Sequence, residues 1–516
     1  MTSMHALPII ILDFGSQYTE LIARRVRELE VYCEVFPYDV NPDTLALYQI
    51  SGVILSGSHE SVYDNQDVRI PSWVFALNVP ILGICYGMQA MAHQHGGSVK
   101  AHDKKEFGLA HLELTAQDPL FEGIPERSCV WMSHGDQVLS IPSAFVSLAA
   151  SENTANAVMR HIDRPWYGVQ FHPEVTHTEY GQTLLQNFVY KLCKISPDWT
   201  PQHILDELRQ QVSAEVGRDE YVLLGLSGGV DSLVLAVFLE GLLGARLKCV
   251  FVDTGLLRYE EAKDLMENFA YLGLNVEMIS AREQFLSALE GISDPEAKRK
   301  TIGRVFIEVF AQTALNHKEA SFLAQGTIYP DVIESAASHT GKAKVIKSHH
   351  NVGGLPEHLP FKLLEPLRKL FKDEVRNLGR LLQIPERLIM RHPFPGPGLG
   401  VRILGEIKSE YIKILQQADH IFMEVLRAKG WYERCSQAFA VFIPVKSVGV
   451  MGDGRRYDYV IALRAVGTTD FMTAHPVRLP YELLEEAAQR IVNEVPHVSR
   501  VVFDITGKPP ATIEWE

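Results

Sequence analysis

The sequence has no long apolar run, no excess of basic residues and no closely spaced cysteines, and each absence disfavours a class of protein. No stretch of its 516 residues approaches the roughly 18 apolar residues of a membrane-spanning helix. The formal net charge of -14 argues against a general nucleic-acid coat, because such binding depends on lysine and arginine neutralising phosphates, although a local basic pocket stays open. The six cysteines show neither a C-x-x-C pair nor metal-ligand spacing. This cysteine pattern favours a reduced, cytoplasmic protein.

The length and composition indicate several ordinary globular domains. A chain of 516 residues is too long for one hydrophobic core and suggests three domains, or two large ones. Apolar content of 46% and charged content of 22% are usual for such domains. The opening "MTSMHALPIIILDFGSQ" has a short apolar run that ends at once in Asp13 and Gly15, so we expect no signal peptide.

Alternating strand and helix patterns predict the architecture. The first third contains the apolar runs "PIIILDFG", "GVILSG", "PILGICYG" and "WYGVQFHPE" between helical patterns, which predicts a parallel sheet flanked by helices. The proline-containing stretch "KISPDWTPQ", residues 194–202, is the predicted first linker. A second α/β series follows with the runs "YVLLGLS", "KCVFVDTG", "NVEMIS" and "SFLAQGT". It ends near "RHPFPGPGLGVR", where three prolines and three glycines preclude a regular element.

The last part of the chain predicts helix, strand, strand, helix and strand, a small α+β domain that could pair with a second copy. We therefore predict an α/β protein with two doubly wound parallel-sheet domains and a small α+β domain. The predicted boundaries are residues 8–198, 199–391 and 392–516.

A cysteine stands at a predicted strand-to-helix turn. In "PILGICYGMQAMAHQ", Cys85 ends a buried strand, and Tyr86 and Gly87 begin a helical pattern. A nucleophile at such a corner lies beside free backbone N–H groups of the new helix, which favour the thiolate and can bind an oxyanion. A buried structural thiol is the alternative that this motif leaves open.

A histidine and a glutamate downstream favour the catalytic interpretation. In "GVQFHPEVTHT", His172 and Glu174 are two residues apart, so on an extended strand both side chains would project from one face. The glutamate could then orient the imidazole that deprotonates Cys85. A surface histidine and glutamate on an edge strand are the alternative.

Together "GICYGMQ" and "FHPE" resemble the class I glutamine amidotransferases, which release ammonia from glutamine, with support from "LDFGSQYT", "KEFG" and "WMSHGDQV". The resemblance spans roughly residues 8–198 and implies Cys85 as nucleophile, His172 as base and Glu174 as its orienting group. It also implies an oxyanion hole from the backbone N–H groups of Ser58 and Tyr86. The family usually has "SGGP" where this chain has "SGSH", so Ser58 replaces a glycine. We expect activity, because a backbone donor survives this change if Ser58 can hold the required conformation.

A glycine-rich turn after the predicted strand 221–227 has the form of a phosphate-binding loop without the usual lysine. The helix N-terminus, two glycines and two serine hydroxyls can cradle an anion. Asp231 would repel that anion unless a divalent cation lay between them. The predicted contributors to this loop are Ser227, Gly228, Gly229, Val230, Asp231, Ser232 and Leu233.

The motif "SGGVDS" resembles the signature of the ATP pyrophosphatases, which cleave ATP between the α and β phosphates and hold the pyrophosphate in this loop. Because no γ-phosphate is transferred, magnesium would carry much of the charge that a loop lysine carries elsewhere. A glycine turn before a buried helix is the alternative. Asp331 and Glu334 in "GTIYPDVIES" are further metal candidates, or else solvated loop carboxylates. "KVIKSHHNVGGLP" suits a lid in which Lys347 meets phosphates, while its adjacent histidines do not suit zinc.

An amidotransferase followed by a pyrophosphatase and a small third domain resembles the glutamine-hydrolysing GMP synthetase family. The stretches "RHPFPGPGLGVRILGE", "VGVMGDGRRYDY", "DFMTAHPVRLP" and "DITGKPPATIEWE" extend this resemblance over essentially the whole chain. It implies amination of xanthosine monophosphate (XMP): XMP attacks the α-phosphate of magnesium-bound ATP, and ammonia then displaces AMP. It also implies a homodimer and XMP contacts from Arg299, Lys508, Ile513 and Glu514. Cations suit a 5′-phosphate, and a buried carboxylate can accept hydrogen bonds from purine N–H groups; an ordinary ordered terminus is the alternative for "KPPATIEWE".

Two other functions remain open at this stage. The ammonia acceptor could be another molecule such as a tRNA base, although the acidic charge balance speaks against it. The chain could instead be a regulatory binding module with an inactive triad, for which "SGSH" is the only indication.

Overall fold

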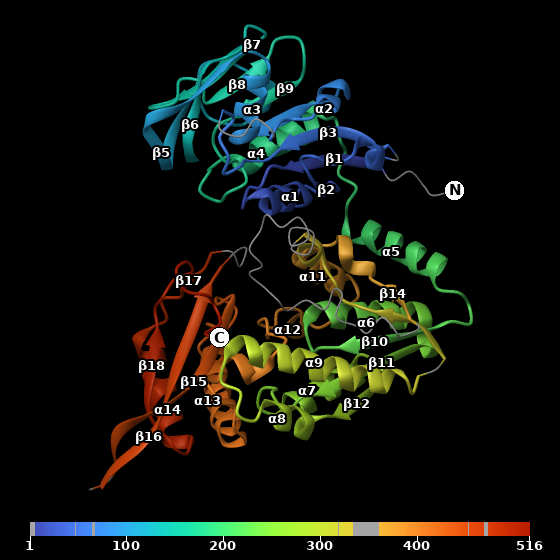
Figure 1. Cartoon of the computed structure of the whole chain (residues 1–516), viewed down its shortest axis with the longest axis vertical. Coiled ribbons are helices and arrows are strands. Elements are labelled where there is room, and N and C mark those ends of the chain that lie inside the picture. Colours follow the sequence, from blue (N-terminus) through green and yellow to red (C-terminus); the bar gives the residue numbers. More distant parts are fainter. Residues whose placement is uncertain are drawn as a thin grey trace. The chain divides into compact units, whose positions relative to one another are not determined.

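The computed structural model of the chain describes residues 6–46, 48–63, 68–317, 319–333, 361–451, 454–468 and 473–516. The chain divides into two compact units, Met1–Ile204 and Leu205–Glu516 (Figure 1).

A nine-stranded sheet forms the centre of the first unit in the described part of the chain. Its first five strands pair in parallel and the remaining four continue antiparallel. In spatial order the strands are β2 (Cys33–Pro37), β1 (Ala6–Asp13), β3 (Gln49–Leu55), β4 (Ile81–Ile84), β9 (Trp166–Val169), β8 (Val158–His161), β7 (Phe145–Ser151), β5 (Ser98–Leu114) and β6 (Arg127–Ser140).

The parallel strands are almost wholly apolar because the sheet is covered by helices. All four residues of β4 are buried, as expected for a strand with both faces covered. The flanking α-helices are α1 (Thr19–Arg27), α2 (Ser72–Ala76), α3 (Tyr86–Gln94) and α4 (Gly181–Gln186). Because parallel strands end at the same edge, the turn after β4 and the segment after the neighbouring β9 lie close together.

The second unit contains a five-stranded sheet whose strands all pair in parallel. In spatial order they are β12 (Val276–Ser280), β11 (Leu247–Asp253), β10 (Tyr221–Leu226), β13 (Ala320–Ala324) and β14 (Lys362–Leu364). The helices of this part are α5 (Pro201–Glu215), which begins just before the unit boundary, α6 (Val230–Leu243), α7 (Glu261–Tyr271), α8 (Arg282–Leu289), α9 (Pro295–Ala314), α11 (Lys372–Leu381) and α12 (Glu386–Ile389).

A separate sheet of β15 (Gln437–Met451), β16 (Gly454–Gly467), β17 (His475–Pro476) and β18 (Val498–Asp504) completes the second unit (Figure 1). One face of β15 and β16, including Phe442 and Leu463, shares a core with helices α13 (Ser409–Ala428) and α14 (Tyr481–Glu494). That core also contains Leu223 of β10, so it joins the two sheets of the unit. The opposite face, with Phe439 and Val441, packs against Ile513 of the C-terminal segment.

The predicted α/β class with parallel sheets is confirmed, and each apolar run named above contains a strand. The boundaries 8–198, 199–391 and 392–516 stay a prediction, since residues 205–516 form one compact unit. Part of the predicted linker is ordered against the first unit, where the backbone N–H of Trp199 donates to the Glu30 carbonyl at 2.8 Å.

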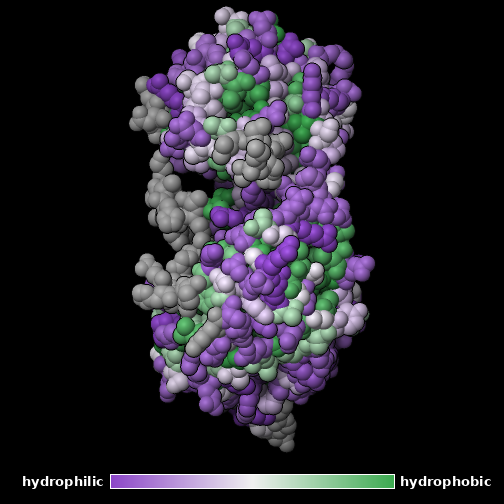
Figure 2. Space-filling model, turned by 90° about the vertical axis from the view of Figure 1, so that its right-hand side faces the viewer, coloured by the Kyte–Doolittle hydropathy of each residue, from purple (hydrophilic) through white to green (hydrophobic). Residues whose placement is uncertain are grey.

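No helix in the described ranges is long and apolar enough to cross a membrane. The face shown in Figure 2 is mostly hydrophilic, with hydrophobic residues in separate patches.

Candidate active sites

Cys85 occupies a strained turn between β4 and α3. Its φ of 49° and ψ of -103° lie where L residues are uncommon, and such strain is typical of functional turns. Two flanking glycines allow the turn: a Cβ on Gly83 would come within 2.6 Å of Gly87, and a Cβ on Gly87 within 2.6 Å of the Leu55 carbonyl oxygen. The backbone N–H of Cys85 donates to the Val169 carbonyl at 2.8 Å, which fixes the turn to β9.

His172 and Glu174 form a buried pair beside this turn. The imidazole Nδ1 lies 2.7 Å from Glu174 Oε1, and both side chains are almost completely buried. Burial alone would lower the pKa of His172, but the Glu174 charge and hydrogen bonds with Cys85 and Glu174 outweigh it and raise this pKa well above 6.5. The arrangement thus stabilises an imidazolium next to the thiol.

The predicted strand geometry of this pair is wrong. Strand β9 ends at Val169, so His172 and Glu174 lie in the irregular segment beyond it. Pro173 between them has no N–H to continue a strand ladder. The segment is held by other bonds: the Thr178 hydroxyl donates to the His172 carbonyl at 2.6 Å, and the Arg25 Nε donates to the Glu174 carbonyl at 3.0 Å. The two side chains meet through this turn.

The stretch from Ser56 to Ser58 lies against the same site. A Cβ on Gly57 would come within 3.5 Å of His172 Cε1, and the Gly87 N–H donates to the Ser56 carbonyl at 3.1 Å. Ser58 is half-buried and has no positive φ, so its side chain does not strain the turn that the family forms with glycine. Tyr86 is anchored by its hydroxyl, which donates to the Val68 carbonyl at 2.6 Å, and burial chiefly raises the pKa of Tyr86 to about 12. The oxyanion role of Ser58 and Tyr86 stays a prediction.

Two glutamines at the thiol were missed by the sequence interpretation. The Gln170 Nε2 donates to Cys85 Sγ at 3.6 Å, and Gln170 Oε1 accepts from Gln89 Nε2 at 3.3 Å. A signal for both existed, because Gln170 is two residues before His172 and Gln89 is one helical turn after Cys85.

The phosphate loop has the predicted form. It joins β10 to the 14-residue helix α6, and Gly228 adopts a φ of 74° where a Cβ would also come within 2.7 Å of Leu265. The hydroxyls of Ser227 and Ser232 lie 3.0 Å apart, and Ser227 Oγ accepts the N–H of Gly229 at 3.3 Å. Val230 and Leu233 are buried, so they can offer a ligand only their backbone.

Asp231 lies next to a lysine that is remote in the sequence. The Lys372 Nζ is 3.3 Å from Asp231 Oδ2, while the buried Asp231 Oδ1 has no hydrogen-bond partner. A carboxylate with an unpaired oxygen fits magnesium, which usually takes one or two protein carboxylates together with substrate phosphates. Within the described residues no three His, Cys, Asp or Glu side chains form a ready metal cluster.

The remaining predicted residues of this site fall in different places. Asp331 Oδ2 accepts the N–H of Ile328 at 3.0 Å and so closes the turn that precedes it. Glu334 and Lys347 lie outside the described residues.

The predicted XMP contacts gather around the C-terminal segment. Arg299 donates to the main-chain oxygen of Glu516, and Ile513 accepts at its carbonyl from Arg464 Nε at 2.7 Å. Lys508 pairs through its backbone with Ala474 at 2.8 and 2.9 Å.

Glu514 is held by an arginine that the sequence interpretation did not select. Arg402 donates to the two carboxylate oxygens of Glu514 at 2.9 and 3.1 Å, and Gln437 Nε2 donates to Glu514 Oε1 at 2.6 Å. The Arg402 side chain is fully buried. Burial alone would lower the pKa of Arg402, but Glu514 outweighs burial and raises it.

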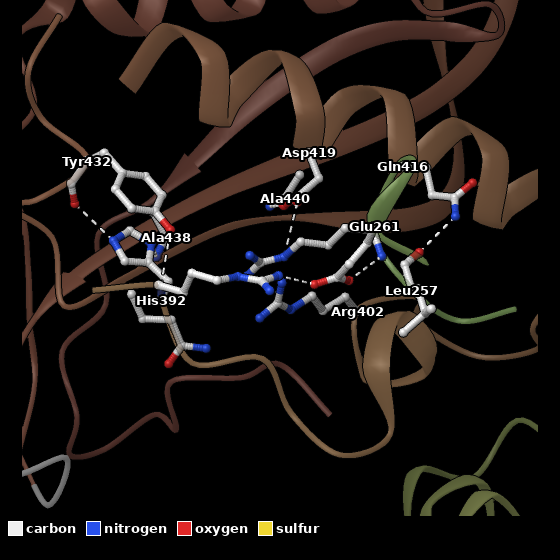
Figure 3. Close-up of polar contacts among 12 residues, drawn as sticks. Leu257, Glu261, His392, Arg402, Gln416, Asp419, Tyr432, Ala438 and Ala440 are labelled. Carbon is white, nitrogen blue, oxygen red and sulfur yellow. Dashed lines mark hydrogen bonds and ion pairs between the residues drawn. The ribbon is translucent and has the colours of Figure 1, made fainter. Parts of the chain in front are cut away.

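A network of buried and partly buried polar groups, which includes Glu261 and Asp419, lies beside Arg402 (Figure 3). Arg391 donates to the Gly228 carbonyl at 3.3 Å and pairs with Glu261. Glu261 also accepts the backbone N–H of Arg258 at 2.9 Å, and the Arg258 guanidinium lies 3.8 Å from Asp419 on α13. Arg391 and Arg258, which are partly buried, and the fully buried Arg402 thus lie among the carboxylates of Glu261, Asp419 and Glu514.

His392 beside this network is neutral at ordinary pH. Burial chiefly lowers the pKa of His392 to about 4. Its ring stacks on Tyr432 with centroids 3.8 Å apart, and its Nδ1 accepts the N–H of Ala438 at 3.2 Å (Figure 3).

Comparisons with known proteins show which proteins this chain resembles. Residues 10–192 match the model of the class-I glutamine amidotransferases, and residues 424–515 match the model of the GMP synthase C terminal domain. Curated proteins named GMP synthase [glutamine-hydrolyzing] match the whole chain. Those of Cronobacter sakazakii and Vibrio cholerae are each 55% identical over 100% of this chain and 99% of their own length. That of Glaesserella parasuis is 55% identical over 100% of both chains.

Cys85 lies in the turn after β4 of this sheet, beside the buried His172 and Glu174. Together with the match to the family model, this arrangement places the first unit among the class-I glutamine amidotransferases. The second unit narrows the assignment. The chain belongs to the family of glutamine-hydrolysing GMP synthases.

Proposed function

We propose that the chain makes GMP from XMP at two sites, one releasing ammonia from glutamine and the other activating XMP with ATP. The observation that carries this proposal is the 55% identity to glutamine-hydrolysing GMP synthases over the whole chain. The contact of Cys85 with His172, which is in turn paired with the buried Glu174, supports it further.

In the first site, Cys85 is the proposed nucleophile. His172 takes the thiol proton, and the sulfur attacks the carboxamide carbon of glutamine. The backbone N–H groups of Ser58 and Tyr86 hold the resulting oxyanion, and His172 returns the proton to the departing ammonia. Water then hydrolyses the thioester to glutamate. Glu174 keeps the imidazole oriented through the bond at 2.7 Å.

In the second site, residues 227–233 are the proposed holders of the pyrophosphate part of ATP. The xanthine O2 attacks the α-phosphorus, pyrophosphate leaves, and ammonia displaces AMP from C2. Magnesium bound with ATP would neutralise phosphate charge, and Asp231, Asp331 and Glu334 are the proposed carboxylates for it. The lid role of Lys347 stays part of the proposal.

The C-terminal segment and Arg299 are the proposed XMP site. Glu514 is held in place by two hydrogen bonds from Arg402, and its carboxylate oxygens can accept further hydrogen bonds from purine N–H donors. Arg299 has five N–H donors and uses one known contact to Glu516, which leaves donors for a phosphate. Ile513 supplies an apolar contact and Lys508 a second cation.

We further propose a homodimer through the hairpin of β15 and β16. Val448 and Tyr457 are directly paired across these strands, and their exposed fractions are 49% and 61%. Val450, two residues farther along β15, is 76% exposed. Neighbouring exposed apolar side chains of this kind favour contact with another protein surface, and a second copy fits the interface that the family resemblance implies.

The proposed location is the cytoplasm, and no nucleic-acid partner is proposed. All six cysteines are free, which a reducing compartment would preserve. The net charge of -14 disfavours a nucleic-acid surface.

Measuring pyrophosphate release tests which molecule accepts the ammonia. With ATP, magnesium and glutamine present, we expect release to require XMP and to match GMP formation one to one. Equal release without XMP would contradict the proposal, and release that required a tRNA would point to the other acceptor.

A further inference from the structure

A fourth side chain contacts the reactive sulfur of the first site. Gln170 directly follows β9, is fully buried, and its backbone N–H donates to the Ala157 carbonyl at 2.8 Å. Its side-chain Nε2 lies 3.6 Å from Cys85 Sγ. The backbone and the side-chain amide of Gln170 are therefore both held in place relative to Cys85.

The orientation of the Gln170 amide follows from its neighbours. Gln89 Nε2 lies 2.8 Å from the Asp136 carbonyl, and because a carbonyl can only accept, the Gln89 NH₂ must point there. The same NH₂ reaches Gln170 Oε1 at 3.3 Å. The oxygen of Gln170 thus faces Gln89, and its NH₂ faces the sulfur.

An N–H that points at the sulfur binds the thiolate form of Cys85 more strongly than the thiol form. A thiolate is a strong acceptor, and a charge-assisted hydrogen bond to it is about twice as strong as a neutral one. A thiol is only a weak acceptor, and its S–H can instead donate to the Ser133 carbonyl, which lies 3.9 Å from Sγ. Burial of Gln170 strengthens the preference, because a low local dielectric strengthens such bonds.

A histidine pair also lies at the sulfur. His172 contacts it from the segment after β9, with Glu174 behind the imidazole, and the Tyr18 ring lies 5.1 Å from the imidazole ring. The Asp136 carboxylate is engaged by Ser61 and by Tyr63 at 2.7 Å. Gln170 thus donates to Cys85 as a neutral side chain, in addition to the contact from His172.

We propose that the Gln170 amide holds the thiolate form of Cys85, receiving no proton itself while the thiol proton goes to His172. This inference rests on the proposed role of Cys85 as nucleophile. Since the same bond withdraws charge from sulfur, Gln170 raises the thiolate fraction at neutral pH and lowers the reactivity of each thiolate.

Alkylation of Cys85 by iodoacetamide, followed by mass spectrometry as a function of pH, tests the inference. In Gln170→Met we expect the pH of half-maximal alkylation to rise by about one unit, and alkylation at neutral pH to fall. The limiting rate at high pH should rise by about threefold, so the two profiles cross. A change in packing or access alone would shift the rate in the same direction at every pH and leave the midpoint unchanged.

Three further variants make the test decisive. Gln170→Glu keeps the size of the side chain and replaces the donor by a carboxylate, so its midpoint should rise further; it also serves if the methionine variant does not fold. Gln182→Met is the matched control, because the Gln182 Nε2 bonds the Arg25 carbonyl at 3.1 Å, away from the sulfur. Cys85→Ala gives the background from the other cysteines.

Unchanged alkylation profiles in both Gln170 variants would overturn the inference. Alkylation uses neither XMP nor ATP, so its outcome is separate from that of the proposed function. A wild-type chain that makes no GMP but shows the shifted variant profiles would refute the proposed function and leave the Gln170 inference standing.

Discussion

The Lys372 ammonium lies 3.3 Å from the Asp231 carboxylate, although the two residues are 141 positions apart. The phosphate loop contains no lysine in its own sequence, and the fold supplies one from the start of α11. A cation in the first turn of a helix is unfavourable with respect to the helix dipole, and the pairing with Asp231 offsets this cost. Lys372 therefore balances the carboxylate in the free chain and lies beside the loop that we propose as the phosphate holder.

Replacing Asp231 by asparagine tests the metal role of this carboxylate. We expect Asp231→Asn to lower GMP formation by about 100-fold with either glutamine or ammonia, because the ATP site serves both. Steady-state assays with each nitrogen donor check this. The control is Asp264→Asn on the exposed side of α7, which should retain full activity. Retained activity in Asp231→Asn would exclude it as an essential magnesium ligand.

The buried pair of His172 and Glu174 predicts a pH dependence with a definite sign. The folded pKa of His172 is raised above its usual 6.5, so the imidazolium form stabilises the fold fully below about that pH. This contribution is lost as the pH rises through the folded pKa. Glu174→Gln removes the charge that raises the pKa of His172, so NMR titration of the imidazole should show a lower midpoint. A midpoint equal to wild type would contradict the assigned cause.

Breaking the contact between Arg402 and Glu514 should destabilise the second unit. Arg402→Met leaves the Glu514 carboxylate without its buried partner, which costs about 3–5 kcal/mol in comparable pairs. Urea unfolding followed by a probe in this unit measures the loss, and the KM for XMP should rise. Arg490→Met breaks a partly exposed pair with Glu494 and should cost less than about 1 kcal/mol. Equal losses in both variants would refute the assignment.

Charge on the exposed hairpin should prevent the proposed dimer. Tyr457→Asp places a carboxylate within the apolar strip of β15 and β16, so sedimentation at micromolar concentration should show a monomer. Tyr271→Asp, at a tyrosine that is 73% exposed on α7, is the control and should leave the assembly unchanged. A wild-type monomer, or a dimeric Tyr457→Asp, would exclude this interface.

The features that could be predicted from sequence are those encoded in short stretches. Cys85 between two glycines and the Gly228 turn before α6 each carry their geometry within a few residues, because local sterics allow few alternatives there. The parallel strands of both sheets could also be recognised as short apolar runs, because strands with covered faces are built from apolar residues. His172 and Glu174 were correctly paired, although the strand expected to hold them ends at Val169.

The contacts that could not be predicted join residues far apart in the sequence. Lys372 reaches Asp231, and Arg402 reaches Glu514 across 112 positions, only because the sheets and helices pack as they do. Gln170 could have been suspected from its position near His172, but its amide orientation depends on Gln89 and on the backbone of Asp136. Contacts of this kind depend on tertiary packing, which the spacing of residues along the chain does not encode.

The two-site account is tested most directly by measuring which nitrogen donor, glutamine or ammonia, the Cys85→Ala variant can use. The account predicts that this variant makes no GMP with glutamine, and that with ammonia it makes GMP at close to the wild-type rate, because the second site needs only NH₃. GMP formation by both routes should be measured on the same folded preparation. Loss of both activities in a folded variant, or glutamine-dependent GMP formation without Cys85, would contradict it.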